Sequence, residues 1–215
     1  EEGYYADAFV NMLALLGWNP GTEQEIFSMD ELVEAFSLER VGKSGSRFDP
    51  EKAKWFNHQY LQKRPVDALA MEFREVLRAK GIQCDLVRLE SLIALVKERV
   101  NFVKEIWDQT EFFFKAPEVY DPEVIKKRWK DESPVQLREL REVLKSCPEF
   151  TASVTEPAVK AWMESKGYNA GAVMNAFRLV IVGASRGPHM FDIISWLGRE
   201  ETLSRIDKGI SALSK

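Results

Sequence analysis

Helix start and stop signals recur along the whole 215-residue chain, and they limit its possible folds more than any other feature. Asp-Pro pairs, in which Asp can cap a helix and Pro fits the first turn, occur at residues 49–50 and 121–122. Ser28 with Glu31 three residues later forms a capping-box sequence. Apolar residues between these signals recur at helical spacing. The pattern predicts an all-α fold.

The predicted helices cover residues 4–16, 28–36, 50–61, 65–80, 86–99, 102–114, 157–166, 170–182, 188–197 and 202–213, and two more start at residues 121 and 133. The segment 177–182, FRLVIV, has the β-branched composition of a buried strand. We predict a helix there, because the chain contains no second strand candidate of similar strength with which it could pair.

The composition excludes several classes of protein. Cys84 and Cys147 lie far apart and form no CxxC pair, and His58 and His189 are the only histidines. A zinc site or a disulfide framework is therefore not expected, which fits a reducing, cytoplasmic setting. The longest uncharged stretch, residues 8–22, is too short and too polar to span a bilayer, so we expect no membrane partner.

Basic residues are concentrated in two places although the net charge is -4. Residues 40–64 hold seven bases against two acids, and residues 169–191 hold Arg178 and Arg186 without any acid. Such basic islands in an acidic chain suggest a polyanionic partner that contacts the chain only at these segments. The same pattern also fits a solvated charged face.

Bases alternate with aromatic residues in the first island. The residues concerned are Lys43, Arg47, Lys52 and Lys54, together with Phe48, Trp55, Phe56 and Tyr60. Cations bind phosphates and aromatic faces stack on bases, so the mixture suits nucleic acid, and Lys52 and Trp55 share one helix face. Alternatively Trp55, Phe56 and Tyr60 are core and only the lysines meet water, which we expect for most of these three residues.

Motifs of catalysis are absent from the sequence. The chain has no P-loop, no GxSxG, no HExxH and no glycine-rich dinucleotide loop, and neither cysteine has an obvious activating base. We therefore assign no catalytic residue and no metal ligand. The sequence chemistry favours a binding module over an enzyme.

Several strings resemble one family, the bacterial-type glutamyl-tRNA synthetases. At the N-terminal end these are YYADAFVNMLALLGWNPG, EIFSMDELVEAFSLERVGKSG and FDPEKAKWFNHQYL, and at the C-terminal end FRLVIVGASRGPHMFDIISWLGREETLSRI. The resemblance covers essentially the whole chain, although residues 65–166 match mainly in helix pattern and aromatic placement.

The resemblance implies only the C-terminal half of such an enzyme, because the family's catalytic domain with its HIGH and KMSKS motifs is missing. A start at Glu1 instead of Met agrees with a fragment. We expect a short helical stem-contact segment (residues 1–64) followed by two packed helical anticodon-binding subdomains (residues 65–118 and 119–215).

The resemblance also implies what the chain should do. The full-length enzyme, a cytoplasmic monomer, would use ATP and Mg²⁺ to attach glutamate to its tRNA. This fragment would bind that tRNA, with no DNA or membrane partner, no cofactor of its own and no catalytic activity.

Positions that match the family's tRNA contacts lie at both ends of the chain. By resemblance, Lys52 and Trp55, with Lys54 as a further candidate, contact the inner corner of the tRNA near its D arm. Arg99 matches an arginine that inspects the third anticodon base.

The other matched positions belong to the anticodon site near the end of the chain. Arg178, Gly187, Pro188 and Met190 match residues that hold the remaining anticodon bases. The chain departs from the family pattern at residues 182–183, where Val-Gly replaces Thr-Gly, and at His189, where a small residue is common.

Two alternatives remain open at this point. Arg99 could form a structural ion pair with an acid on another helix, since its neighbours at i±4, Leu95 and Val103, supply no partner. The whole chain could instead be a stand-alone helical adaptor that binds proteins through apolar helix faces. Salt dependence separates the two functions, because tRNA binding weakens steeply with added salt and an apolar interface does not.

Overall fold

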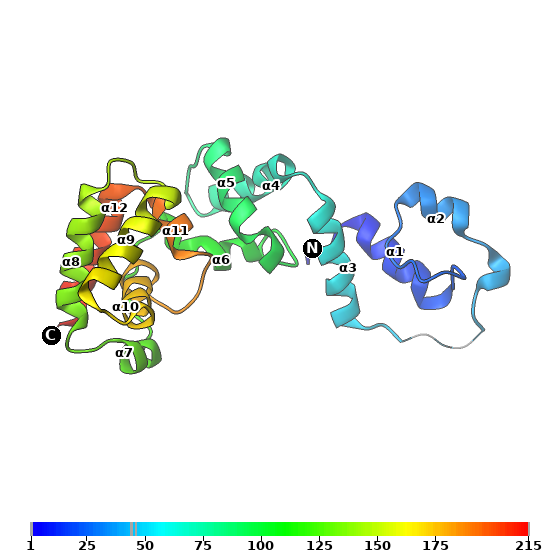
Figure 1. The fold of residues 1–215 in the computed structure, drawn as a ribbon. Coiled ribbons are helices and arrows are strands. Elements are labelled where there is room, and N and C mark those ends of the chain that lie inside the picture. The colour runs from blue at the N-terminus through cyan, green and yellow to red at the C-terminus, as the bar shows by residue number, and fades with distance from the viewer. Residues whose placement is uncertain (1, 44, 46, 215) are drawn as a thin grey trace. The chain divides into compact units, whose positions relative to one another are not determined.

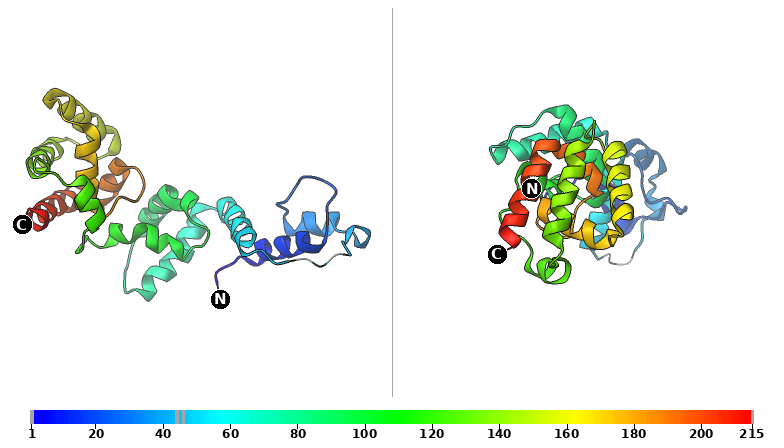
Figure 2. Two further views of the ribbon diagram at one scale, coloured as in Figure 1. Left: turned by 90° about the horizontal axis from the view of Figure 1, so that it is seen from below. Right: turned by 60° about the vertical axis from the view of Figure 1, so that its left-hand side comes forward.

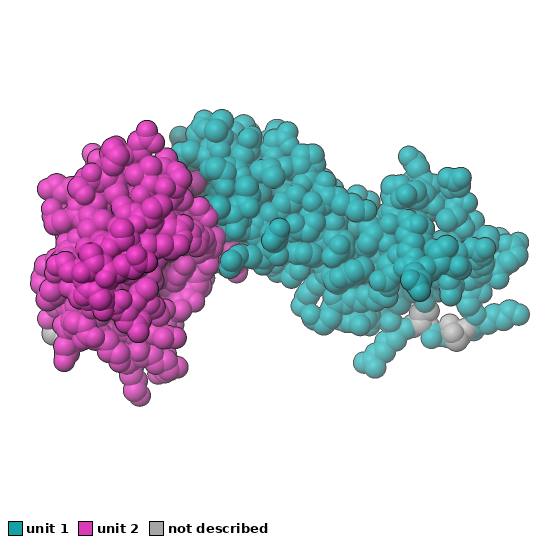
Figure 3. All heavy atoms as spheres, in the orientation of Figure 1, with its two compact units in different colours: residues 1–108 teal, residues 109–215 magenta. Residues whose placement is uncertain are grey.

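The structure, a computed structural model, describes residues 2–43, 45 and 47–214. Within these residues the chain forms twelve α-helices, two 3-10 helices and no strand, with one isolated antiparallel bridge between Trp18 and Val41. The prediction of an all-α fold is therefore confirmed. The chain divides into two compact units, Glu1–Asp108 and Gln109–Lys215, which Figure 3 shows in different colours.

Unit 1 contains α1 (Ala6–Gly17), α2 (Met29–Ala35), η1 (Leu38–Arg40), α3 (Pro50–Lys63), α4 (Val66–Ala79), α5 (Leu86–Val96) and η2 (Lys97–Arg99) (Figure 1). Helix α6 (Glu105–Phe114) contains the division between the units. Unit 2 continues with α7 (Pro122–Arg128), α8 (Ser133–Ser146), α9 (Ala152–Lys166), α10 (Ala170–Val182), α11 (Met190–Leu197) and α12 (Arg199–Leu213). The division into three parts at residues 64 and 118 stays a prediction.

Local capping fixes where several helices of unit 1 begin. Ser28 and Glu31 form the predicted capping box at the start of α2. The Asp49 side chain accepts hydrogen bonds from the N–H groups of Glu51 and Lys52, and Pro50 fills the first position of α3. Helix α1 packs on α3, and α4 packs on α5. The Asp49 cap and Pro50 therefore fix where α3, the helix that carries Lys52, begins.

Unit 2 is a bundle in which α8 contacts α9 and α12, and these three helices lie side by side in the right-hand view of Figure 2. Helix α10 contacts both α8 and α12. The strand-like segment 177–182 is the end of α10, and every residue of it except Arg178 is buried. Burial on several sides accounts for its continuous apolar composition. A side chain at Gly209 of α12 would place its Cβ 2.5 Å from that of Val180, so glycine permits the close approach of α10 and α12.

Some predicted helix ends were wrong. Helix α9 begins at Ala152, and Pro157, expected to open it, lies inside it. Proline cannot donate to the Ser153 carbonyl, yet the helix starts earlier because its residues Thr155 and Val159 are buried in the unit and packing outweighs the local signal.

The start of α6 was also predicted too early. A start at residue 102 was expected, but the Glu105 carboxylate accepts the N–H groups of Asn101 and Phe102, and the helix begins at Glu105. Helix α11 begins at Met190 rather than at residue 188, and α12 begins at Arg199 rather than at residue 202.

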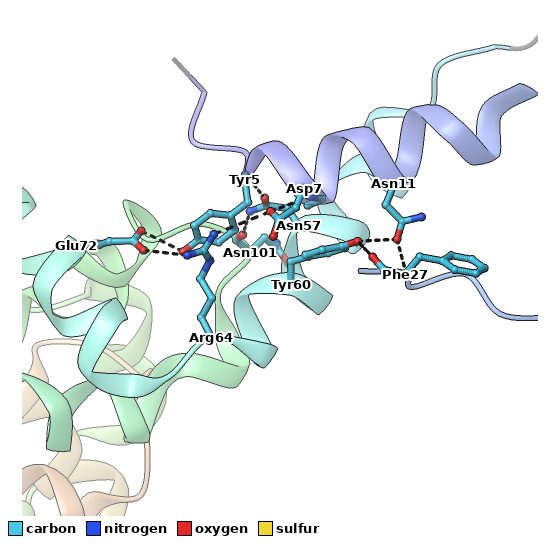
Figure 4. Close-up of polar contacts among 10 residues, drawn as sticks. Tyr5, Asp7, Asn11, Phe27, Asn57, Tyr60, Arg64, Glu72 and Asn101 are labelled. Carbon is cyan, nitrogen blue, oxygen red and sulfur yellow. Dashed lines mark hydrogen bonds and ion pairs between the residues drawn. The ribbon is translucent and has the colours of Figure 1, made fainter. Parts of the chain in front are cut away.

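A buried hydrogen-bond cluster joins α1, α3 and the segment before α2 (Figure 4). Asn11 Oδ1 accepts from the Phe27 N–H and from the Tyr60 hydroxyl, each at 2.8 Å, and this hydroxyl also contacts the Phe27 carbonyl oxygen. Burial raises the pKa of Tyr60 to about 12, so the phenol keeps its proton and acts as a donor at neutral pH. The cluster fixes α1 against α3.

We expect Tyr60→Phe to lower the free energy of unfolding by about 0.5–1.5 kcal/mol, because it removes a buried donor from two acceptors. Urea unfolding of both proteins measures the difference. Tyr4→Phe is the control, since among the described residues the Tyr4 hydroxyl makes no hydrogen bond. Equal losses in the two variants would show that the Tyr60 hydrogen bond contributes nothing.

Candidate nucleic-acid interface

The first two turns of α3 expose three of the residues that the sequence singled out, Lys52, Lys54 and Trp55. The Lys52 and Lys54 side chains are about half exposed, and Trp55 is 40% exposed. Phe56 and Tyr60, at 0% and 7%, belong to the core. Two of the three aromatic residues in α3 are therefore core, as expected, and Trp55 offers an indole ring at the surface. Phe48, just before α3, is also exposed, at 45%.

Each lysine of this surface has a carboxylate beside it. Lys52 Nζ lies 2.9 Å from Glu25 Oε1, and Lys54 Nζ lies 2.8 Å from Glu51 Oε1. The hydrogen bond from Lys54 to Glu51 raises the pKa of that lysine, so it stays charged. Exposed pairs of this kind are worth about 0–1 kcal/mol, so a phosphate can replace the carboxylate at little cost.

Arg99 is the last residue of η2, the short 3-10 helix that follows α5, and its side chain is exposed. Both α3 and α5 contact η2. The structure therefore places Arg99 at the end of an element, where the sequence predicted a turn between two helices. Arg99, Lys52, Lys54 and Trp55 all belong to unit 1.

The other predicted residues meet in unit 2, in the loop of residues 183–189 between α10 and α11. Arg178, on the last turns of α10, donates from Nη1 to the Arg186 carbonyl at 2.9 Å and to the Pro188 carbonyl at 3.0 Å. One guanidinium nitrogen thus holds both sides of Gly187. In this structure Arg178 fixes the loop backbone.

Gly187 and Met190 show how tightly the loop is packed. Gly187 has φ +102°, and a Cβ there would lie 2.9 Å from Phe112 Cζ, so only glycine fits. Pro188 is buried and Met190 is 2% exposed. A base contact by the Met190 side chain would require it to leave the core. The contact roles of Gly187, Pro188 and Met190 stay predictions.

Two residues that support this loop were not among the predicted site residues. Gly183, with φ +83°, ends α10 next to Pro117, and its carbonyl accepts the Asp121 N–H at 2.8 Å. Arg205 on α12 is 2% exposed and donates to the carbonyls of Phe112 and Ile181 at 2.5 and 3.0 Å.

Arg205 is also paired with Glu201 at 2.7 Å, four residues earlier on α12. In sequence this spacing looks like an ordinary surface ion pair, so no local signal reveals that Arg205 is buried. His189, where the family pattern has a small residue, is half exposed and lies 3.7 Å from both Glu156 and Asp192. The histidine therefore stands beside two acids at the start of α11.

The two cysteines lack the surroundings of a reactive thiol. Burial raises the pKa of the Cys84 and Cys147 thiols, so neither is an activated nucleophile. Among the helices described, none combines the length and the apolar character needed to cross a bilayer.

An exposed surface that combines basic side chains with an aromatic ring suits an RNA-binding module, because cations bind phosphates and aromatic rings stack on bases. The chain belongs to the anticodon binding domain family, whose model matches residues 55–210. Over 213 residues it is 52% identical to a glutamate–tRNA ligase of Porphyromonas gingivalis and 51% identical to one of Flavobacterium johnsoniae. Both matches cover 99% of this chain and 42% of the relative, so the chain spans about two fifths of the length of these relatives.

Solved structures give the same result. The chain matches a glutamate tRNA ligase from Elizabethkingia meningosepticum, crystallised in complex with its amino acid, with a TM-score of 0.96 and 43% identity over 99% of this chain and 42% of that one. A glutamate-tRNA synthetase from Elizabethkingia anophelis matches with a TM-score of 0.92 and 40% identity, covering 98% and 41%. These matches give no support to the alternative of a protein-binding adaptor.

We expect Arg178→Met to lower the free energy of unfolding by about 1.5–3 kcal/mol, because two carbonyls lose a charged donor. Amide hydrogen exchange of residues 183–189 should also accelerate. Arg138→Met on α8 is the matched control, since the Arg138 side chain makes no hydrogen bond or ion pair with the described residues and is exposed. Unchanged loop exchange in Arg178→Met would show that the loop holds its shape without this arginine.

Proposed function

We propose that this chain is the C-terminal, tRNA-binding part of a glutamate–tRNA ligase. The match of the anticodon-binding family model to residues 55–210 carries the proposal, and similarity to glutamate–tRNA ligases over 99% of the chain supports it. In the longer protein, a cytoplasmic monomer, an upstream half would attach glutamate to the tRNA with ATP and Mg²⁺. We assign no residue of this chain to ATP or to the metal ion, and DNA and membranes are not partners.

Two kinds of contact follow from the two kinds of surface. Lys52, Lys54 and Trp55 present charge and an aromatic face on a regular helix, which suits the phosphates and sugars at the D-arm corner of tRNA. Anticodon bases are unstacked and can be splayed out, so they can be recognised by arginine forks and by loop backbone. Arg99 and the loop held by Arg178 suit that second task.

Binding to glutamate tRNA should therefore be steeply salt-dependent, and Lys52→Ala should reduce the salt slope by roughly one unit. All tRNAs should be weakened about equally, because a phosphate contact carries no sequence information. Lys54→Ala should likewise reduce the salt slope by roughly one unit and weaken all tRNAs about equally. Titration of the chain with labelled tRNA at several salt concentrations measures both quantities.

Two further variants control this experiment. Glu25→Gln should strengthen tRNA binding, because it removes the carboxylate that competes for Lys52, and Lys208→Ala on α12 should leave the slope unchanged. A Lys52→Ala protein with an altered preference between tRNAs and an unaltered slope would show that α3 recognises bases. Salt-independent binding would contradict the proposed function altogether.

Arg99 should decide between glutamate and glutamine tRNA. Their anticodons share the first two bases and differ at the third, which is C for glutamate and G for glutamine. Because C and G present different donors and acceptors, a well-placed arginine can contribute about 1–3 kcal/mol of discrimination. We expect Arg99→Gln to remove most of this preference.

Affinities for two tRNA transcripts that differ only in the third anticodon base measure the preference. The control is Arg78→Gln, which changes an exposed arginine on α4 that is paired with Glu75. Equal discrimination in wild type and Arg99→Gln would mean that Arg99 is structural and that selectivity lies around Arg178 and Pro188.

A further inference from the structure

The turn that carries Arg99 is held by side chains of α3. Gln62 Nε2 donates to the Lys97 carbonyl at 2.7 Å, and His58 Nδ1 lies 2.9 Å from the Val100 carbonyl oxygen. Asn57 Nδ2 donates to the Asn101 carbonyl at 2.5 Å. Three backbone carbonyls within five residues therefore have their partners on another helix.

The direction of these hydrogen bonds is fixed by chemistry. A carbonyl oxygen can only accept, so His58 Nδ1 carries a proton. Asn57 Oδ1 accepts the Tyr5 N–H at 2.8 Å, which turns its amide nitrogen toward Asn101 (Figure 4). Asn57 is 0% exposed, so it links the start of α1 to the turn without competition from water.

The turn also binds back to α3 and to α6. Lys97 Nζ donates to the Arg64 carbonyl at the end of α3 at 2.6 Å, and Glu105 accepts the Asn101 N–H at 2.7 Å. The end of a helix leaves carbonyl groups without intrahelical partners, and such ends fray unless other groups pair with them. Here α3 supplies those partners on both sides of Arg99.

We propose that Asn57, His58 and Gln62 are positioning residues that fix the direction of Arg99 and thereby the choice between C and G at the third anticodon base. The proposal rests on the proposed role of Arg99. A bidentate contact discriminates between two bases only while its geometry is held. A more mobile turn should therefore lower the preference for C over G more than it lowers the affinity for tRNA. Trp55 and Gln62 lie seven residues apart on α3, about 10 Å along its axis, so one helix carries the D-arm surface and holds the anticodon residue.

The main test is Gln62→Met in the 215-residue chain, which keeps the length of the side chain and removes its donor. Gln62 is half-buried, so the variant is easier to fold than a change at Asn57. Gln59→Met is the matched control: it makes the same change one turn earlier on α3, at a side chain with no hydrogen bond to any described residue. Affinities for the two transcripts and hydrogen exchange of residues 97–103 are measured.

In Gln62→Met we expect the preference for C over G to fall by roughly threefold to tenfold and the exchange of residues 97–103 to accelerate. The salt slope should stay as in wild type, because no phosphate contact is lost. Gln62→Lys should restore the preference, since its ammonium group can donate to the Lys97 carbonyl. Gln59→Met should match wild type in every measurement.

The outcomes separate this proposal from the one on which it rests. If Arg99→Gln removes the preference while Gln62→Met keeps it in full, the positioning role is overturned and the role of Arg99 stands. If Arg99→Gln keeps the preference, both are overturned. A loss in Gln62→Met without faster exchange of the turn, or an equal loss in Gln59→Met, also overturns positioning, since the effect would then not pass through the turn.

Discussion

Each helix end in this protein leaves backbone N–H and C=O groups that the helix itself cannot pair, and the structure depends on how these groups are satisfied. A buried polar group without a partner costs about 1–3 kcal/mol, which is large against the stability of a domain. At the start of α3 the neighbouring Asp49 supplies the partner. Beside the proposed contact residues the partners come from distant helices: Gln62 binds the Lys97 carbonyl and Arg205 binds the Ile181 carbonyl. The same hydrogen bonds that close these helix ends hold the segments that would meet RNA.

Burial sorts the arginines of the chain into different tasks. Arg205, at 2% exposure, is surrounded by two carbonyls and Glu201, and a buried charge needs all of these partners. Arg178 is half-buried, and its Nη1 is committed to the backbone of the 183–189 loop. Arg99 is exposed at the end of η2. Arg205 is enclosed and Arg178 is half-buried, whereas an arginine that contacts a base must reach solvent. Burial therefore matches Arg205 to a supporting role, Arg178 to holding the loop, and Arg99 to the base contact proposed for it.

The sequence predicted what local chemistry decides. The caps at Ser28, Asp49 and Asp121 and the helix over residues 170–182 are confirmed, because a cap or a missing strand partner is visible within a few residues. The start of α9 was wrong, since buried contacts of residues beside Pro157 outweigh the proline signal. The links that hold the sites were not predictable in this way. Gln62 and Lys97 are 35 residues apart, and Arg205 and Phe112 are 93 apart. No periodicity connects residues at such separations, so the candidate residues could be named from family resemblance while their supports could not.

Lysine and arginine meet carboxylates throughout the chain, and access of water decides what each pair does. The Lys52–Glu25 pair is about half exposed on both sides, so solvent screens it and its two members can exchange partners at a cost of about 0–1 kcal/mol. A phosphate of the proposed tRNA partner would then compete on nearly equal terms with Glu25, and the gain in binding would come from released counterions. The Arg205–Glu201 pair cannot exchange in this way, because the guanidinium is enclosed and its nitrogens also hold two helix ends. A negative net charge is therefore compatible with binding a polyanion. In the proposed binding mode, Lys52 and Lys54 on the exposed turns of α3 exchange their carboxylates for phosphates.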